Sequence, residues 1–498
     1  MTRLTKVILS LFAVLLIAQA GFSLRWPVAH DEAPLFYEAF VMRTEGRVPY
    51  RDIFDFQMPG SFAAYYVLGR LGGFNELHIR ILDLLILFAL LLVTFFAMRR
   101  FGKLTAFTAI LLFGLKYLQG GPSMSLQRDY LLLIFLALAL WIGMQNDSLN
   151  RMHRLGLGIL FGLAAVIKPH AALGLLPFLF FDIRDMTQRG GITLARAAMQ
   201  SIVPASVGFT IPIFSMVAWL AFTNALFPFL DIVFNYWPLY AQINGQMEIT
   251  VQAERMSFLL GQAVRLGGSG VWLIPAMIGI YLNQNKQAYL LAGLALGYAM
   301  YPALSGQFFP YHYLPFMYFI IPLASLSIST FNPNTSTLKK YFSSFVLLIV
   351  ILLNIRPSQT FVRQLEGRPI VTSTDRAEEI RLYLDKHLEE GDTVQPLDWT
   401  GGTLLAMLEA RAHIATPYIF DFYFYHHVSD PYIQNLRGKF ITDLQEAAPR
   451  FIVEVTAIDK PWVSGPDTSR EFPELREFLD IHYSITIQKA DYVIYERK

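Results

Sequence analysis

Long apolar runs follow one another through the first 356 residues and then stop. They lie at 7–24, 79–98, 104–118, 129–144, 155–167, 170–181, 200–222, 270–284, 288–303, 309–329 and 341–355. A helix needs about 20 apolar residues to cross a bilayer, and fewer where it is short or broken by Pro and Gly. The pattern therefore predicts a polytopic α-helical membrane protein with about 11 transmembrane helices.

The segment Lys168-Pro169-His170 decides how these runs are counted, because without it residues 155–181 would form one long helix. With the split, and with the N-terminus in the cytoplasm, the loops rich in Lys and Arg fall on the cytoplasmic side, as the positive-inside rule requires. Arg99 and Arg100 lie in one of these loops. We therefore expect a multi-pass protein of the inner (plasma) membrane whose C-terminal tail is extracytoplasmic, and periplasmic if the cell is Gram-negative.

The first run is either a retained helix or a cleaved signal peptide. Basic residues precede it, and Ala18-Gln19-Ala20 resembles the small-residue site at which such a peptide is cut. The apolar character continues past this site to Leu24, which favours a retained helix. In either case the segment that follows faces outward.

Charge divides the chain into two domains. Residues 1–356 hold 25 Lys and Arg against 15 Asp and Glu, whereas residues 357–498 hold 15 against 23. Only 16% of all residues are charged, compared with about 25% in an ordinary soluble domain. We expect a transmembrane domain over 1–356, with outer loops at 25–78 and 223–269, and an extracytoplasmic domain over 357–498.

The tail has the pattern of a soluble α/β domain. A helical run from Arg376 to Leu388 begins after Asp375, a favoured cap residue, and ends before Gly391. Runs rich in β-branched and aromatic residues predict four strands, at Thr393–Leu397, Phe451–Val455, Tyr483–Gln488 and Tyr492–Tyr495.

Composition and motifs exclude several classes of function. The chain has no Cys, which excludes disulfides, thiolate metal sites and a cysteine nucleophile. Neither a P-loop nor a dinucleotide-binding glycine motif is present. The chain has no basic stripe and its aromatic residues lie in apolar runs, so nucleic-acid binding has no support.

Two pairs of ionisable residues lie near the ends of apolar runs, where such groups suggest function. Asp31 and Glu32 precede the stretch 33–42, which looks helical, so the structural alternative for Asp31 is a helix N-cap. Arg128 and Asp129 begin another run, where an interfacial ion pair would be the structural alternative.

Two further cations stand at comparable places. Lys168 lies at the tip between two short apolar helices, where a snorkelling lysine and a phosphate-binding cation are both reasonable. His312 begins a late apolar run beside aromatic residues, so its structural alternative is membership of the aromatic belt at the membrane surface.

The order of these motifs resembles that of the polyprenyl-phosphate-sugar glycosyltransferases of the GT-C superfamily, which includes bacterial aminoarabinosyltransferases and protein O-mannosyltransferases. The similarity covers nearly the whole chain and is strongest in the first outer loop. It is carried by His30-Asp31-Glu32, Glu45-Gly46-Arg47-Val48-Pro49-Tyr50-Arg51-Asp52, Met58-Pro59-Gly60, Tyr65-Tyr66, Arg128-Asp129, Lys168-Pro169, Tyr311-His312-Tyr313 and the outer α/β tail.

The resemblance implies an enzyme that moves a monosaccharide from a polyprenyl-phosphate donor to an acceptor hydroxyl, with inversion at the anomeric carbon. It assigns the catalytic base to Asp31, with Glu32 as its companion, and the second acidic site to Asp129. Some members carry a phosphate-binding Lys just before the Pro of the first loop, where this chain has Gln57-Met58-Pro59. Donor-phosphate binding is therefore expected among Arg51, Arg128, Lys168 and His312.

The other partners follow from the same resemblance. The acceptor is a glycan, a lipid or a protein side chain, and membrane lipids surround the spans. A divalent cation could bridge the carboxylates and the phosphate, because hard cations prefer oxygen ligands, but no residue spacing demands one.

Three other functions stay open. A transporter or flippase for a lipid-linked or small anionic substrate would carry ionisable residues inside its spans. Asp83 is the only acidic residue that we place inside a predicted span. An anchored scaffold would leave the acidic residues near the span ends unexplained. A polymerase or ligase acting on lipid-linked glycans is a close enzymatic relative.

Overall fold

The computed structural model describes residues 3–329, 336–370 and 373–498. Contacts divide the chain into two compact units. The first contains Met1–Leu24, Ile81–Ala218 and Met256–Glu366, and the second contains Arg25–Arg80, Trp219–Arg255 and Gly367–Lys498. The predicted outer loops at 25–78 and 223–269 thus belong largely to the same unit as the tail.

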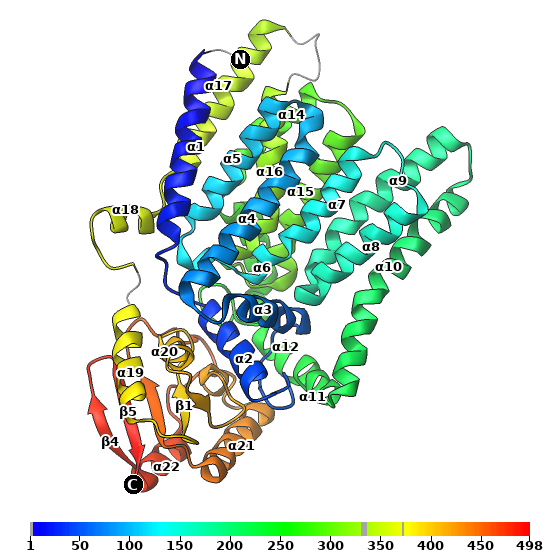
Figure 1. Cartoon of the computed structure of the whole chain (residues 1–498). Helices are drawn as coiled ribbons and strands as arrows, with labels where there is room; N and C mark the ends of the chain where they lie inside the picture. The colour runs from blue at the N-terminus through cyan, green and yellow to red at the C-terminus, as the bar shows by residue number, and fades with distance from the viewer. Residues whose placement is uncertain (1–2, 330–335, 371–372) are drawn as a thin grey trace. The chain divides into compact units, whose positions relative to one another are not determined.

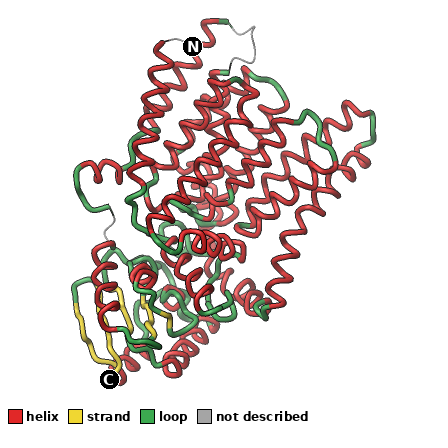
Figure 2. Tube along the Cα trace, in the orientation of Figure 1, coloured by secondary structure: helices red, strands yellow, loops and turns green. Residues whose placement is uncertain are grey.

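The first unit is built from helices (Figures 1 and 2). Their bounds are α1 (Arg3–Ser23), α4 (Glu76–Met98), η1 (Arg99–Phe101), α5 (Lys103–Gln119), η2 (Pro122–Met124), α6 (Arg128–Leu131), α7 (Leu133–Gln145), α8 (Arg151–Ile167), η3 (Pro169–Gly174), α9 (Leu175–Gly190), α10 (Leu194–Phe222), α13 (Gln252–Arg265), η5 (Leu266–Gly268), η6 (Gly270–Trp272), α14 (Leu273–Leu282), α15 (Lys286–Ser305), η7 (Pro310–Tyr313), α16 (Leu314–Ser325), η8 (Leu326–Ile328), α17 (Thr337–Asn354) and α18 (Gln359–Leu365); α4, α10 and α13 cross into the second unit.

Each of the eleven predicted apolar runs is helical over most of its length, and some, such as 129–144, cover two consecutive helices. Among the described residues, six helices are long and apolar enough to cross a membrane. The number is seven if the two helical stretches Ala253–Gly268 and Gly270–Leu282, which meet at a bend of 67°, count as one span. The other four runs form α1, α5, α8 and α9, whose apolar lengths fall below 18 residues. The protein is therefore a polytopic helical membrane protein, and its shorter helices account for the higher number expected from the sequence.

Helix α16 forms the centre of this unit. It packs against α5, α14 and α15, and every residue from Leu314 to Ser325 is buried. The hydroxyl of Tyr318 lies 2.6 Å from that of Thr94 on α4, so the two buried hydroxyls form a hydrogen bond inside the helix bundle. By contrast α10 is mostly exposed within the unit, as expected of a helix that faces lipid.

Helices α8 and α10 approach each other through glycines. A Cβ atom on Gly158 would lie 2.0 Å from the backbone oxygen of Ala205, and one on Gly208 would lie 2.1 Å from that of Leu155. Such contacts are possible only without a side chain, and small residues are the usual means of close helix packing in membranes. This packing fixes α8, whose C-terminal end carries Lys168.

The second unit contains a mixed five-stranded sheet. Its elements are α2 (Glu32–Thr44), α3 (Pro59–Gly72), α11 (Leu226–Asp231), η4 (Ile232–Tyr236), α12 (Trp237–Tyr240), α19 (Thr374–His387), β1 (Thr393–Leu397), α20 (Thr403–Glu409), β2 (His413–Ile414), η9 (Phe422–Phe424), α21 (Pro431–Ala447), β3 (Phe451–Val455), α22 (Pro473–His482), β4 (Tyr483–Gln488) and β5 (Tyr492–Arg497). Figure 2 shows the strands gathered side by side near the C-terminus.

The strand order is β2-β1-β3-β5-β4. Strand β1 runs parallel to β2 and β3, whereas β5 is antiparallel to β3 and β4. Strand β3 is buried along its whole length, as expected for a central strand covered on both faces. The predicted α/β tail is confirmed, and the four predicted strands coincide with β1, β3, β4 and β5.

The segment before residue 80 packs into this sheet domain as part of the same unit. The hydroxyl of Tyr37, on α2, donates to the backbone oxygen of Ala412 over 2.7 Å. Farther along, the backbone N–H of Phe54 donates to the oxygen of Pro417 over 2.8 Å. Because one side-chain contact and one backbone contact both reach backbone oxygens on either side of β2, the first outer segment and the tail form one folded body.

Candidate functional site

Asp129 lies at the centre of a buried polar cluster in the first unit. It stands in the first turn of α6, and its side chain is fully buried. Its Oδ1 atom accepts a hydrogen bond of 2.5 Å from the Tyr301 hydroxyl on α15. Its Oδ2 atom lies 2.8 Å from Lys168 Nζ. The carboxylate thus joins three segments that are far apart in the sequence.

Lys168 occupies the break that the sequence predicted. Helix α8 ends at Ile167, and η3 begins at Pro169. A residue before Pro avoids the helical conformation, and Lys168 is accordingly extended, with φ −145° and ψ 118°. Its Nζ atom also lies 5.6 Å from the centre of the Tyr311 ring. Proline therefore ends the helix at the residue that supplies the cation.

His312 lies in η7 and is buried. Its ring stands nearly perpendicular to those of Tyr301 and Tyr311, with centroid distances of 6.4 Å and 4.9 Å. Its Nδ1 atom is 3.5 Å from the Ser305 hydroxyl. The structure therefore brings His312 to the same tyrosine that binds Asp129, so three of the predicted residues, Asp129, Lys168 and His312, belong to one cluster.

Arg128 is buried directly beside Asp129 in α6. An interfacial ion pair that merely ends a span does not account for this position, because Asp129 is tied to another helix break through Lys168. The cluster therefore combines the cations Arg128 and Lys168 with one carboxylate and the His312 imidazole. Such a group can hold an anion with more than one negative oxygen.

Tyr301 was not among the predicted residues. Its hydroxyl donates to Asp129, and its ring lies against His312 and His170, with the His170 centroid 5.7 Å away. In the sequence it is one of many tyrosines in or near apolar runs, where the expected role is an anchor at the membrane surface. Only its tertiary contacts single it out.

Asp31 belongs to the second unit and is 6% exposed. It precedes α2, but its side chain makes no capping hydrogen bond with that helix. Its Oδ1 atom lies 3.0 Å from His30 Nδ1. The helix-cap explanation of Asp31 is therefore not supported, and the side chain is held beside an imidazole instead.

Glu32 is fully buried and forms a bidentate pair with Arg80. The guanidinium donates to both carboxylate oxygens, over 2.8 Å and 2.5 Å, and also to the backbone oxygens of Trp26 and Pro27. Arg80 thus fixes the loop that leads to Asp31. The sequence alone does not single out Arg80, because one Arg near the start of an apolar run resembles an ordinary interfacial charge.

Arg51 lies in the same unit but in a different setting. It is exposed, forms an ion pair of 2.7 Å with its neighbour Asp52, and donates to the backbone oxygen of Thr223 over 3.0 Å. The hydrogen bond from Arg51 lowers the pKa of Asp52 below its ordinary value. These contacts give Arg51 a local role in the outer loop, and its part in donor binding stays a prediction.

No group of three or more His, Asp or Glu side chains suited to a metal ion occurs among the described residues. Acidic clusters of that kind are what hard divalent cations require. The part of a divalent cation in this protein therefore stays a prediction.

A family model described as dolichyl-phosphate-mannose-protein mannosyltransferase matches residues 59–194. This stretch contains Arg128, Asp129 and Lys168. Among solved structures, ArnT from Cupriavidus metallidurans bound to undecaprenyl phosphate matches with a TM-score of 0.61 and 13% sequence identity, over 99% of this chain and 98% of that one. The same protein in the apo state matches with a TM-score of 0.53 and 13% identity, over the same shares.

The chain has the GT-C fold expected from its sequence. The resemblance to polyprenyl-phosphate-sugar glycosyltransferases is confirmed by the family match, and the multi-pass membrane character by the helices. Archaeal oligosaccharyltransferase AglB from Archaeoglobus fulgidus, in complex with an inhibitory peptide and a dolichol-phosphate, also matches, with a TM-score of 0.45 and 12% identity over 89% of this chain and 69% of that one. Comparison with curated proteins gave no match.

Proposed function

We propose that this GT-C protein transfers a monosaccharide from a polyprenyl-phosphate donor to an acceptor hydroxyl on the extracytoplasmic side of the inner membrane. The observation that carries the proposal is the ion pair between the partly buried Lys168 and the fully buried Asp129, with Arg128 and His312 beside it. The likeness to ArnT bound to undecaprenyl phosphate supports a lipid-phosphate donor. A glycan, a lipid or a protein side chain would serve as acceptor.

Lys168 holds the donor phosphate in this mechanism. When the bond between the anomeric carbon and the phosphate oxygen breaks, the phosphate takes the bonding electrons and gains negative charge. Preorganised cations in a site of low dielectric stabilise such charge strongly. An ammonium has three donors, so Lys168 can be positioned by Asp129 and still donate to a phosphate oxygen.

Asp31 is the proposed general base. It removes the proton from the acceptor hydroxyl while the acceptor oxygen attacks the anomeric carbon, and a single displacement of this kind inverts the configuration. A base must come within hydrogen-bond distance of the proton that it takes, and the Arg80–Glu32 pair anchors the loop that carries Asp31. Glu32 acts as its positioning companion rather than as a second base.

The transporter alternative depends on ionisable residues inside spans. Asp83 lies within α4, but its two oxygens accept hydrogen bonds from Tyr117 over 2.6 Å and from Ser125 over 2.7 Å. These contacts are typical of a buried structural carboxylate. They do not indicate an ion pathway, so the transferase is favoured.

Mass spectrometry of lipid that co-purifies with the full-length protein would identify the donor, and the purified protein with that donor would then be assayed for sugar transfer. We expect transfer to be lost in Asp31→Asn and Lys168→Ala and to persist in Asp480→Asn, which changes an exposed carboxylate on α22. Full transfer in both site variants would contradict the proposal. Movement of an intact lipid-linked sugar across vesicles without transfer would favour the transporter instead.

A further inference from the structure

A hollow of about 490 Å³ opens in the first unit where α4 and α7 end. It is lined by Phe96, Arg99, Arg100, Trp141, Met144 and Gln145. The volume lies within the range of small-ligand sites in proteins, roughly 300–1,000 Å³. Asp129 and Gln145 stand at opposite ends of one span, Arg128–Gln145. The hollow is therefore a different place from the Asp129 cluster.

The walls of the hollow are held together by hydrogen bonds. Gln145 donates to the backbone oxygen of Phe96 over 3.0 Å. Arg100 donates to the backbone oxygen of Met144 over 3.1 Å and to the Asp147 carboxylate over 2.7 Å. Since these bonds join the end of α4 and η1 to the end of α7, the hollow has fixed sides.

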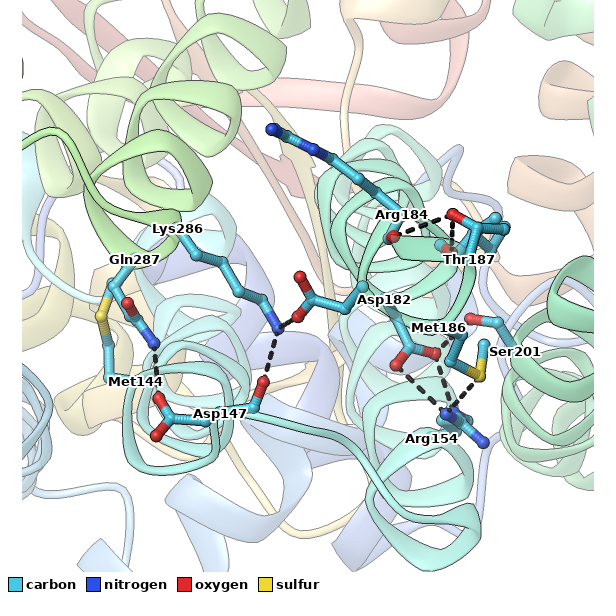
Figure 3. A network of polar contacts seen from close by, with 12 residues as sticks. Met144, Asp147, Arg154, Asp182, Arg184, Met186, Thr187, Ser201, Lys286 and Gln287 are labelled. Atoms are coloured by element: carbon cyan, nitrogen blue, oxygen red, sulfur yellow. Dashed lines mark hydrogen bonds and ion pairs between the residues drawn. The ribbon is translucent and has the colours of Figure 1, made fainter. Parts of the chain in front are cut away.

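The surrounding charge is positive. Lys286 donates to the backbone oxygen of Asp147 over 3.1 Å and Gln287 donates to the Asp147 carboxylate over 3.2 Å (Figure 3). Lys286 is also paired with Asp185 of α9. Arg99 is exposed and lines the hollow beside Arg100. Around the hollow, three cations (Arg99, Arg100 and Lys286) therefore outnumber two carboxylates (Asp147 and Asp185). The net positive charge is complementary to an anion.

The lining also has an apolar side. Phe96 and Trp141 are 41% and 43% exposed, and both lie on helices that are long and apolar enough to span the membrane. Trp side chains collect at the boundary between lipid and water, and Arg side chains reach headgroups from span ends. An occupant with one charged end and one apolar end therefore fits better than a free anion.

We propose that this hollow binds an anionic phospholipid, with the phosphate at Arg99 and Arg100 and the acyl chains against Phe96 and Trp141. The positive-inside rule predicts that this end of the spans lies on the cytoplasmic side, where anionic lipids attract Lys and Arg. The site is then a lipid contact of the transferase that is separate from its donor site.

Native mass spectrometry of the full-length protein in detergent tests this. The probes are phosphatidylglycerol, phosphatidylcholine with the same chains, and inorganic phosphate. We expect phosphatidylglycerol to bind at least tenfold more tightly than phosphatidylcholine, and phosphate alone to bind far more weakly. Arg99→Ala should weaken phosphatidylglycerol binding by about tenfold, as expected for loss of one charge-assisted contact.

Two matched variants complete the design. Arg99→Lys keeps the charge and should retain most of the binding, which separates loss of the contact from misfolding. Arg184→Ala removes an exposed arginine of α9, at the edge of the network in Figure 3, and should leave binding unchanged. Equal binding of both lipids, an unaffected Arg99→Ala protein, an equal loss in Arg184→Ala, or phosphate binding as tight as the lipid would each overturn the proposal.

Discussion

The Nζ atom of Lys168 lies 2.8 Å from Oδ2 of Asp129, and this pair joins the break after α8 to the start of α6, with Asp129 fully buried and Lys168 partly buried. A buried ion pair contributes little net stability, but removal of one partner leaves a buried charge that nothing balances. The ion pair therefore links two helical segments and also holds the Lys168 ammonium in one position. These two roles can be separated by experiment.

We expect Lys168→Ala to lower the unfolding free energy by about 3–5 kcal/mol and to abolish sugar transfer, because the Asp129 carboxylate loses its cation. The double variant Lys168→Met with Asp129→Asn should recover most of the stability, since neither charge remains. It should not recover transfer. Thermal unfolding in detergent and the transfer assay measure the two effects, and recovery of transfer in the double variant would show that Lys168 has only a structural role.

In the second unit, the pair between Arg80 and Glu32 is also buried, so removal of one partner again leaves a buried charge that nothing balances. Arg80→Ala leaves the Glu32 carboxylate buried without its guanidinium and removes the donors to Trp26 and Pro27. We expect a loss of about 3–5 kcal/mol in unfolding free energy together with reduced transfer, because the loop before Asp31 is no longer held. Unchanged thermal stability and transfer in Arg80→Ala would refute this.

Asp31→Asn should reduce the rate of transfer by at least a hundredfold, in line with the contribution of a general base. Loss of a true N-cap costs about 1 kcal/mol, but Asp31 makes no capping bond with α2. The unfolding temperature of the Asp31→Asn protein should therefore stay within about 2 °C of that of the wild type. Measurement of kcat, KM and unfolding temperature on one preparation tests both parts. A stability loss that accounts for the lost activity would count against catalysis by Asp31.

The contact between α8 and α10 provides a test of the membrane fold. Gly158→Ala would place Cβ 2.0 Å from the Ala205 oxygen, so the helices must separate, at a cost of about 1–3 kcal/mol. Gly156→Ala is the matched control, because a Cβ there meets nothing within 4 Å. We expect the unfolding temperature to be lowered in Gly158→Ala and not in Gly156→Ala. Equal unfolding temperatures for the two would contradict the close packing.

Glu409 gives the second unit a predictable dependence on pH. Burial, and then repulsion from Glu76, raise the pKa of Glu409 from 4.5 to about 7. The folded protein therefore binds a proton that the unfolded chain releases between about pH 4.5 and 7, so this residue's contribution to stability falls as pH rises through that window. Glu409→Gln should unfold at a higher temperature than the wild type at pH 8 and show no gain at pH 4. The opposite trend would contradict the raised pKa.

Much of the fold could be predicted because the relevant patterns are local. The apolar runs coincide with helices, and the strands of the tail coincide with β1, β3, β4 and β5, since run length and β-branched composition act over a few residues. Span length was harder to predict. The runs 104–118, 155–167 and 170–181 lie on α5, on α8 and on η3 with α9, and these three α-helices are shorter than a bilayer span, so hydropathy alone does not decide whether each of them crosses the membrane.

The sequence by itself determined the residue types of the candidate site: a carboxylate after the first helix, Arg128-Asp129, a Lys before a Pro, and a late His among aromatic residues. Only the tertiary structure decided their partners. It joined Asp129 to Lys168 and Tyr301, and Glu32 to Arg80. The physical reason is that a buried charge must find a counter-charge or hydrogen-bond donor, and which one it finds depends on how helices from distant parts of the chain pack.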